Sequence, residues 1–501
     1  MPTDAPILLK QDDPFEPADW YEAAEAKRAL PRALIGGTES MLAEPEYLPQ
    51  EPAEEDDDYE IRRNRSVLFN AFRRAVCVLV GKPLARKIVR AGIPPAVEPL
   101  LDDVDGRGTP LELFCRDWFF RAWVDGECSV LVDFPGELAL PRDANLKQER
   151  EANLRPYLVL VPAADLIGLR KAREGGGRVL DQIRIRCTTT VPLGAYGEET
   201  VEQVRVFNRD GSYAAFEKND EGLPVLVQSG RFDLSRIPLV TLRLGDTPPL
   251  LDLAYLNLTH FRSSSDQRHI LHVARVPLLF GPGFSDEDLV VSPNAFISNT
   301  NSDSDLKYVE IQGGAIAAGA SDLASLQEQM AMLSMEMLIP RSTGNVTATA
   351  RALEFAESSS DAQAAALQLQ EAINDVLELL CEWLGVDVGL ANLSVVTDFG
   401  ITLGDMQELQ VLASLRNKPN PDLSRRQMLE ELKQRGALRE SFDFDENDRE
   451  LEEESAASAA AQADMLAGAL AASVANAGRD GDGNADDQLA TDPNAVDVST
   501  Q

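Results

Sequence analysis

The chain has 501 residues, of which 44% are hydrophobic and 26% are charged, as in globular proteins with about two to four domains. Its formal net charge of −36 at pH 7 disfavours a simple nucleic-acid-binding module, because contacts to phosphates normally need an excess of Lys and Arg. No window approaches the length of a membrane span, and the first residues lack the basic and apolar regions of a secretory signal.

The N-terminal part is expected to form an extended arm over residues 1–60, because Pro is frequent and seven of the ten residues from Glu51 to Glu60 are acidic. A short helical patch is expected from Trp20 to Leu30. A single helix is then predicted over Tyr59–Val80 and ended by Gly81. Its arginines could contact phosphates, but pairing with the plentiful acidic neighbours is the more common role; they are Arg62, Arg63, Arg65, Arg73 and Arg74.

The next segments predict a helix and then a β-rich region. The helix over Leu111–Val124 is rich in aromatic residues. These are expected to face a core, because basic residues are not interleaved with them as in a base-stacking surface. Residues 156–244 contain alternating and apolar runs with turn signals such as Asn208–Gly211, which predicts a meander or a small mixed domain.

Residues 248–384 predict a helix, a short β-rich insert, a second helix, a loop with Pro and Gly, and a long helix. The second helix spans Ser321–Leu338, and the long helix runs from about Thr347 to a stop at Gly385. The second helix carries apolar residues at a heptad-like spacing, namely Leu323, Leu326, Met330, Leu333 and Met337. This seam needs a partner, either the first helix or a neighbouring subunit, and an ordinary packed helix explains the spacing equally well.

The C-terminal part predicts a smaller helical unit over about Asp405–Gly436, with Ser424 as the N-cap of its clearest helix. After Asp443 the chain loses its core-forming residues. Residues 446–501 are rich in acids, Ala, Gly and Asn, which predicts a mostly disordered tail with a frayed helix near Ser455–Val474.

No motif of a catalytic centre occurs in the chain. The phosphate-binding loop GxxxxGK[ST] and the motifs GxSxG, HExxH and GxGxxG are all absent, so no catalytic, cofactor-binding or metal residue is assigned and no cofactor is expected. His269 and His272 lie one helical turn apart without a nearby Cys, so polar positions on a helix face are expected. The acids after Asp443 imitate a calcium loop but lack its sixth-position glycine. Five widely spaced cysteines without a CxxC motif predict reduced thiols.

Several stretches resemble bacteriophage portal proteins of tailed phages and prophages, in the branch often described as a domain of unknown function. The resemblance covers about residues 55–440 and rests on the order and spacing of four stretches. They are YEIRRNRSVLFNAFRRAVCVLVGKPL, FFRAWVDGECSVLVDFP, the long stretch from IPLVTLRLGDTPPLLDLAYLNLTHF to RVPLLFGPGF, and the Thr-Ala-Thr-Ala that opens the long helix.

The resemblance implies an α+β portal fold with a mixed α/β wing, a helical stem, a small β-containing clip, a long crossing helix with a tunnel loop, and a helical crown. The implied segments are an N-terminal arm (1–60), the wing (61–247), a first stem helix (248–275), the clip (276–319), a second stem helix (320–339), the tunnel loop (340–346), the long helix and wing return (347–399), the crown (400–445) and an acidic, mostly disordered tail (446–501).

The resemblance also implies a function without catalysis. A ring of about twelve copies would stand at one vertex of the capsid and form the channel for DNA packaging and ejection. Its partners would be other copies of itself, double-stranded DNA, the terminase large subunit, then a head–tail adaptor, and the major capsid and scaffold proteins, with no membrane. The ring would assemble in the host cytoplasm and remain in the virion.

The implied tunnel loop contains one charge, Arg341, which is a candidate for contact with DNA phosphates; equally, it could cap an acidic helix of the neighbouring subunit. Its small neighbours could offer hydrogen bonds without regard to base sequence; they are Ser342, Thr343, Gly344 and Asn345. Two other functions stay open from the residues alone. One is a phage enzyme that works through carboxylates or a metal, and the other is a different head-completion or scaffold-like protein, which the insert between two helices argues against.

Overall fold

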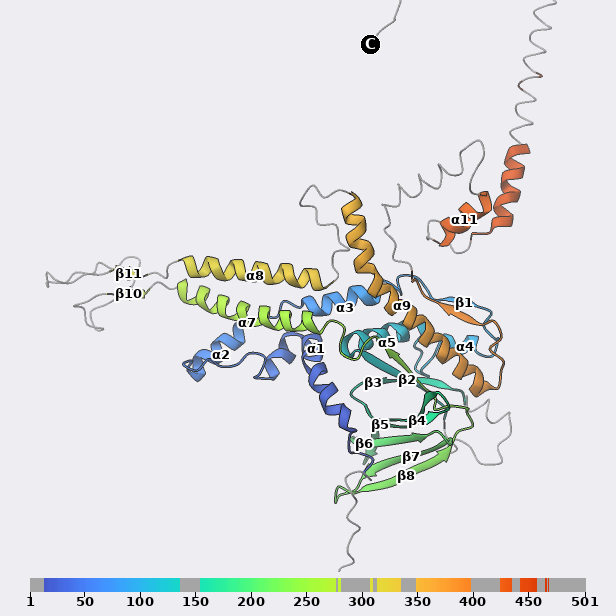
Figure 1. The fold of residues 1–501 in the computed structure, drawn as a ribbon, viewed down its shortest axis with the longest axis horizontal. Coiled ribbons are helices and arrows are strands. Elements are labelled where there is room, and N and C mark those ends of the chain that lie inside the picture. Colours follow the sequence, from blue (N-terminus) through green and yellow to red (C-terminus); the bar gives the residue numbers. More distant parts are fainter. Residues whose placement is uncertain are drawn as a thin grey trace, which may run out of the picture. The chain divides into compact units, whose positions relative to one another are not determined.

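The computed structural model describes residues 13–135, 154–275, 278–280, 307–309, 313–334, 348–397, 424–434, 442–456, 465 and 467. The chain divides into two compact units, Met1–Ile401 and Thr402–Gln501, which are described separately. Figure 1 shows helices together with antiparallel sheets. The expected α+β class is therefore confirmed, whereas the assignment of portal segments stays a prediction.

The first helix, α1 (Asp19–Ala43), takes up 25 residues of the segment 1–60 for which the sequence predicts an extended arm. The helical patch expected over Trp20–Leu30 is confirmed, but the helix continues to Ala43 where an extended arm was predicted, because Leu34 and Met41 are fully buried in the core. Pro31 lies inside the helix, and Gly37 interrupts its geometry with a φ of 82°. Pro and Gly usually interrupt helices, so the apolar spacing around these two residues is a weak signal for a helix in the sequence.

The single helix predicted over Tyr59–Val80 is also wrong, because the chain forms α2 (Asp56–Arg65) and α3 (Ala71–Gly81). Side chains end one helix and start the other. The Ser66 hydroxyl donates to the Arg62 carbonyl at 2.8 Å, and the Asn70 side chain accepts from the backbone N–H of Arg73 at 2.9 Å. The acidic run contributes the first turn of α2 and arginines its last turn, an order that suits the helix dipole.

The centre of the first unit is α5 (Leu111–Asp125) packed on a three-stranded sheet of order β3-β2-β9. The strands are β2 (Glu127–Asp133), β3 (Tyr157–Pro162) and β9 (Leu239–Arg243). Phe114, Trp118, Phe119 and Trp123 are buried, which confirms that the aromatic residues of this helix face a core. The short α4 (Glu98–Leu101), which precedes α5 in the chain, adds two further buried leucines.

The predicted β-rich region forms β3, β9 and a five-stranded meander. Its strands pair in the order β4 (Leu166–Glu174), β5 (Gly177–Leu193), β6 (Gly197–Asn208), β7 (Ser212–Lys218) and β8 (Pro224–Arg231). The expected turn after Asn208 joins β6 to β7, with Gly211 at a φ of 82°. One face of the meander packs toward Leu131 and Leu239, and Phe15 covers part of the other.

The block after residue 248 has the predicted order. It consists of α7 (Leu251–Ala274), the antiparallel pair β10 (Leu278–Phe280) and β11 (Lys307–Val309), α8 (Gly313–Leu333) and the long α9 (Ala348–Leu384). The second helix begins earlier than Ser321, because Gly313-Gly314 do not prevent helix formation here. The expected stop after α9 is confirmed, since Gly385 adopts a φ of 62°.

The end of α9 packs against β2 and β9, and the nearby β12 (Asn392–Ser394) pairs with β1 (Val89–Ala91). Ile373, Val376 and Leu380 are buried in this contact region. Trp383 donates from Nε1 to the Val132 carbonyl at 3.1 Å and stacks on Phe134. The long helix is therefore fixed to the three-stranded sheet at its C-terminal end.

In the second unit, α11 (Arg425–Gln434) confirms the expected helix. Ser424 and Gln427 cap it reciprocally, because the Ser424 hydroxyl accepts from the Gln427 N–H at 3.1 Å and the Gln427 side chain accepts from the Ser424 N–H at 3.3 Å. Residues 444–456 are also helical, which places the tail helix earlier than expected. Asp443 caps this helix by accepting from the N–H groups of Asp445 and Glu446.

A buried ionic cluster joins α1 to the end of α5 and the start of β2. Arg28 is 5% exposed and donates to the Asp125 carbonyl at 3.0 Å and to Glu127 at 2.7 Å. Arg32 donates to the Asp125 carboxylate at 2.7 Å and pairs with Glu25 at 2.5 Å. Because these charged groups are mostly shielded from water, the stability of each charge depends on its ion-pair partners.

Replacement of Arg28 by Met should lower the free energy of unfolding by about 3–5 kcal/mol, because Glu127 would remain buried without its main partner. Urea unfolding followed by tryptophan fluorescence measures this loss. Arg243→Met is a matched control, since Arg243 also faces Glu127, at 3.7 Å, but its side chain is 54% exposed. The control should change the unfolding free energy by no more than about 1 kcal/mol, and an equal loss in both variants would contradict the prediction.

Candidate functional site on helix α7

The helix α7 is in contact with four other helices of the first unit. It packs against α8 on one side and against α1, α2 and α3 elsewhere on its surface, and Figure 1 shows α7 and α8 side by side. It also buries four polar side chains: Asn257 at 0% exposure, Ser265 at 2%, His260 at 3% and Gln267 at 8%. A buried polar group needs a hydrogen-bond partner, so each of these residues constrains what lies against it.

Asn257 fixes the segment that separates α2 from α3. Its side-chain oxygen accepts from the backbone N–H of Phe72 at 3.0 Å, and its side-chain nitrogen donates to the Phe69 carbonyl at 2.8 Å. Both bonds satisfy backbone groups next to a helix start, where no helical partner exists. The break between α2 and α3 is therefore held by a residue almost 190 positions later in the chain.

Ser265 and Arg62 form the second connection. The Ser66 and Ser265 hydroxyl oxygens lie 2.7 Å apart, and Arg62 donates to the Ser265 oxygen at 3.5 Å. Arg62 is 4% exposed and pairs with both carboxylate oxygens of Glu54 at 2.7 Å. Its hydrogen bonds hold the pKa of the Glu54 carboxyl below the usual value. The expectation that these arginines pair with acidic neighbours is confirmed for Arg62 and for Arg63, which faces Glu60 at 3.3 Å.

Gln267 and His260 connect α7 to α8. Gln267 donates to the Ile316 carbonyl at 2.9 Å, and His260 Nε2 lies 3.2 Å from Gln327 Nε2. Since the partner number on α8 rises as the number on α7 falls, the two helices run antiparallel. Gly319 lets the Gln267 side chain lie close to the α8 backbone, because a Cβ atom at position 319 would lie 2.1 Å from Gln267 Oε1.

His260 is also enclosed from the other side, because its ring lies 5.4 Å from the Phe69 ring, measured between centroids. Within the described part of the chain, its Nδ1 atom has no hydrogen-bond partner. Burial lowers the pKa of His260, so the ring is neutral in the folded protein at neutral pH. The contact between α7 and α8 thus includes one group whose charge would be unfavourable.

The heptad-like seam is only partly directed toward α7. Leu326 and Met330 are buried at 8% and 1% exposure, and Leu323 is half-buried. Leu333, by contrast, is 42% exposed and its neighbour Met332 is 58% exposed. Met337 lies outside the described residues, so the role of the seam as an oligomer contact stays a prediction.

The tunnel-loop candidates also fall outside the described residues; they are Arg341, Ser342, Thr343, Gly344 and Asn345. Among the residues that the structure does describe, no three His, Cys, Asp or Glu side chains come together as a metal site. The five cysteines are all free thiols, as expected, although Cys77 is exposed rather than buried. No helix in the described ranges has the length and apolarity needed to cross a membrane.

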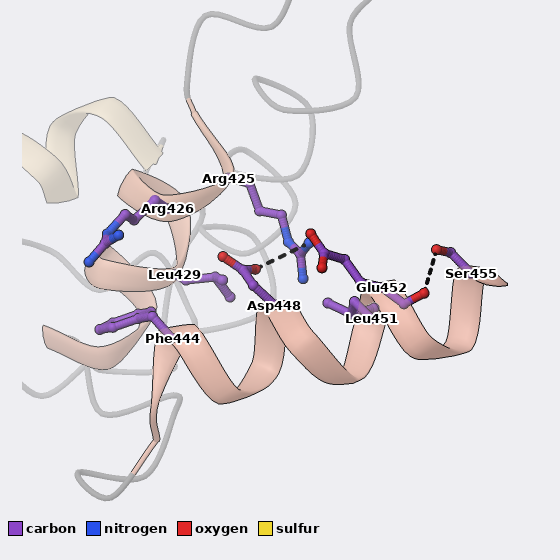
Figure 2. A pocket seen from close by; sticks show the side chains of 8 residues that line it. All are labelled: Arg425, Arg426, Leu429, Phe444, Asp448, Leu451, Glu452 and Ser455. Carbon is purple, nitrogen blue, oxygen red and sulfur yellow. Dashed lines mark hydrogen bonds and ion pairs between the residues drawn. The ribbon is translucent and has the colours of Figure 1, made fainter. Parts of the chain in front are cut away.

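The second unit contains a pocket between α11 and the helix over residues 444–456, shown in Figure 2. Leu429, Phe444 and Leu451 supply its apolar lining, and Arg425 lies 3.5 Å from Asp448 across it. Asp443, the first acid of the stretch that imitates a calcium loop, instead caps the helix by accepting from two backbone N–H groups. The pocket holds opposite charges that already pair, and no catalytic arrangement results.

The sequence predicted that Arg62 pairs with acidic neighbours and singled out the seam, but it did not predict the contacts of α7 with Ser66, Phe69 and Ile316. Asn257, Ser265 and Gly319 were not recognised as site residues. The available signal was weak: polar residues such as Ser263-Ser264-Ser265 in the middle of a helix are unfavourable unless their side chains find partners.

The comparisons with known proteins give one family match and several solved structures. A family model described as a domain of unknown function, DUF4055, matches residues 249–384, which is less than half of the chain. No curated protein matches the chain. The family match coincides with the block from α7 to α9.

Among solved structures, a chain of the virion of the native gene transfer agent (GTA) particle has 13% identity and a TM-score of 0.41, covering 79% of this chain and 98% of that one. A chain of the neck of the native GTA particle with C12 symmetry has 13% identity and a TM-score of 0.37, covering 72% and 89%. A chain of the neck of the empty GTA particle with C6 symmetry has 13% identity and a TM-score of 0.40, covering 80% and 99%. Because these TM-scores lie below 0.5, they do not establish a common fold or function.

Replacement of Asn257 by Ala should lower the free energy of unfolding by about 2–4 kcal/mol, because the Phe72 N–H and the Phe69 carbonyl lose their partner in a buried place. Urea unfolding measures this loss, and hydrogen exchange should show faster exchange at residues 66–72. Thr259→Ala is the control on the same helix, since the exposed Thr259 hydroxyl bonds only within α7. Equal exchange at residues 66–72 in the wild type and the Asn257 variant would contradict the role given to Asn257.

The protonation of His260 predicts a pH dependence. The pKa of His260 in the folded protein lies below its unfolded value of about 6.5. The neutral ring therefore contributes fully to the free energy of unfolding above a pH of about 6.5, and this contribution is lost as the pH falls through the folded pKa. His260→Gln should therefore reduce the decrease in unfolding free energy between neutral and mildly acidic pH. Unfolding curves over this range measure it, with the exposed His272→Gln as the control. An unchanged pH dependence in His260→Gln would show that another group is responsible.

Proposed function

We propose that the chain is a bacteriophage portal protein, which forms a ring of about twelve copies at one capsid vertex and conducts DNA during packaging and ejection. The observation that carries the proposal is the arrangement of residues 251–384. An antiparallel helix pair, α7 and α8, is separated by an insert with the small β10–β11 pair and is followed by the long α9. This is the order of stem, clip, stem and crossing helix that the sequence resemblance implies.

The surroundings of the helix pair support self-assembly. Within the described residues, α8 makes its main helix contact with α7 and leaves Met332 and Leu333 exposed. The opposite side of α7 is already occupied by α1, α2 and α3. Exposed apolar side chains on a helix that is supported from one side only are well suited to a contact with a neighbouring copy.

The segments would then have the roles that the resemblance gives them. The wing would comprise the two larger sheets with α5, and the stem would comprise α7 and α8. The clip would be shorter than residues 276–319, because α8 already begins at Gly313. The clip would contact the terminase large subunit and later the head–tail adaptor, and residues 400–445 would form the crown. Capsid and scaffold proteins would surround the ring in the virion.

The strongly acidic composition suits a channel that DNA must pass without adhering to it. A net charge of −36 repels phosphates, and a few local basic groups would then determine where the protein contacts DNA. Arg341 remains the candidate for such a contact in the tunnel loop. Arg341→Gln should then leave the ring intact and change the rate of DNA packaging in an assembly assay.

Replacement of Leu333 by Lys should weaken ring formation. Leu333 is exposed in the isolated chain, and a Lys near a helix C-terminus is compatible with the helix dipole, so the folded chain should be preserved. Burying the ammonium group between copies would raise the protein concentration needed for assembly by about tenfold or more.

Light scattering coupled to size-exclusion chromatography measures the assembled mass against the 54.7 kDa of one chain. Leu390→Lys is the matched control, because Leu390 is 95% exposed and lies away from α8 in the chain. A wild-type protein that remains monomeric at all concentrations would contradict the proposed function. Assembly that is equally strong in Leu333→Lys would remove α8 from the interface.

A further inference from the structure

The hairpin formed by β5 and β6 projects beyond the rest of its sheet. β4 pairs with β5 only over residues 177–185, and β7 pairs with β6 only over residues 203–207. Residues 188–193 and 197–202, called the ribbon below, pair only with each other among the described residues. An isolated two-stranded ribbon is marginally stable in water, so the ribbon would gain stability from a surface on which it can pack.

One face of the ribbon is apolar and carries a single acid. Side chains alternate along a strand and directly paired residues share a face, so Val191, Leu193 and Val201 lie on the same face as Glu199. Leu193 is 60% exposed, and Tyr196 at the tip is fully exposed. Glu199 is exposed and has no ion-pair partner in the described part of the chain. This face therefore offers apolar side chains around one unpaired carboxylate.

A second exposed surface, at β1, has the complementary chemistry. Lys87 and Val89 are exposed, whereas Ile88 between them is buried, so the first two share the outer face. Val89 is paired with the small Ser394 of β12, which leaves its side chain accessible at 63% exposure. Within the described ranges, no acid pairs with Lys87. The β1 surface, defined by Lys87 and Val89, thus combines an apolar side chain with an unpaired cation.

The ribbon and the β1 surface match in spacing as well as in charge. Leu193 is paired with Gly197, so Glu199 lies diagonally across the ribbon from Leu193, at about 7–8 Å. Lys87 and Val89 are two residues apart along an extended chain, which places them about 7 Å apart. Leu193 can therefore contact Val89 while Glu199 contacts Lys87.

The two surfaces lie on opposite sides of α5 in one copy. The base of the ribbon lies beside the start of α1, where the Arg186 guanidinium is 6.0 Å from the centre of the Tyr21 ring. α1 is hydrogen-bonded to Asp125 at the end of α5, whereas Arg90 of β1 lies 3.7 Å from Glu112 at the start of α5. Figure 1 shows α1 and β1 on opposite sides of α5. A contact between the ribbon and the β1 surface therefore joins two copies.

We propose that the apolar face of the ribbon docks on the β1 surface of a second copy, with Leu193 against Val89 and Glu199 beside Lys87. The contact joins two different surfaces, so it repeats from copy to copy and closes a ring if the rotation permits. It rests on the self-assembly of the proposed function and adds a contact separate from that of α8. Residues 61–97 contain nine Lys or Arg and no Asp or Glu, so they attract an acidic ribbon although the whole chain has a charge of −36.

Chemical crosslinking tests the proposed contact. Leu193→Cys and Val89→Cys are combined in one chain that also carries Cys77→Ser, since Cys77 is the exposed native thiol, and the assembled protein is treated with a short bismaleimide. A denaturing gel should show a ladder of multiples of 54.7 kDa, and each single substitution should give no ladder. Thr190→Cys with Val89→Cys is the matched control and should give none, because Thr190 lies on the other face of the ribbon.

An exchange of charges tests the pairing without cysteines. Glu199→Lys and Lys87→Glu should each raise the protein concentration needed for assembly by about threefold or more, because like charges would then meet. The double variant should return close to the wild-type concentration, which a defect in folding would not do. Asp220→Lys makes the same change of charge at an exposed position of the β7–β8 turn and should assemble like the wild type.

The outcomes separate this contact from the proposed function. Ring-sized assemblies, measured by light scattering, that give no ladder and no rescue by the double variant would overturn the contact and leave the portal function standing. A crosslinked product that has the mass of one chain would also overturn it, because the ribbon would then contact its own copy. Chains that stay monomeric at all concentrations would contradict both.

Discussion

The buried polar side chains of α7 are the constraint on which the helical part of the structure depends. A donor or acceptor left without a partner in such a place costs about 1–3 kcal/mol, so each side chain fixes the position of its neighbour. Asn257 holds the break between α2 and α3, Ser265 receives the Ser66 and Arg62 side chains, and Gln267 binds the start of α8. One helix thereby determines the placement of segments that are about 50 to 200 residues away in sequence.

This constraint has a consequence for the proposed assembly. A helix pair that is supported only by its own apolar contact could slide or rotate, since apolar packing is not directional. The hydrogen bonds of α7 remove that freedom and present one defined surface of α8, with Leu333 exposed. The other fixed element is α9, whose Trp383 is bonded to the central sheet. Both α7 and α9 are therefore attached to other elements of the first unit.

Local patterns in the sequence were sufficient for several of the long elements. Apolar periodicity and terminal glycines predicted α5, α7 and α9, and alternating residues predicted the β-rich region. The failures have physical causes. Frequent Pro and the acidic run suggested that the first segment is extended, but burial of Leu34 and Met41 stabilises a helix there. The site could not be predicted, because Arg62 and Ser265 are 203 positions apart and their contact follows from the tertiary fold.

Electron cryomicroscopy of the purified assembly tests most directly whether the α7–α8 pair is the structural unit of a DNA channel. We predict a ring of about twelve copies in which these helix pairs stand next to one another and form the wall of a central opening. The contacts of Asn257, Ser265 and Gln267 should be preserved within each copy. Isolated chains, or a closed assembly whose helix pairs point away from any central opening, would contradict the proposed portal function.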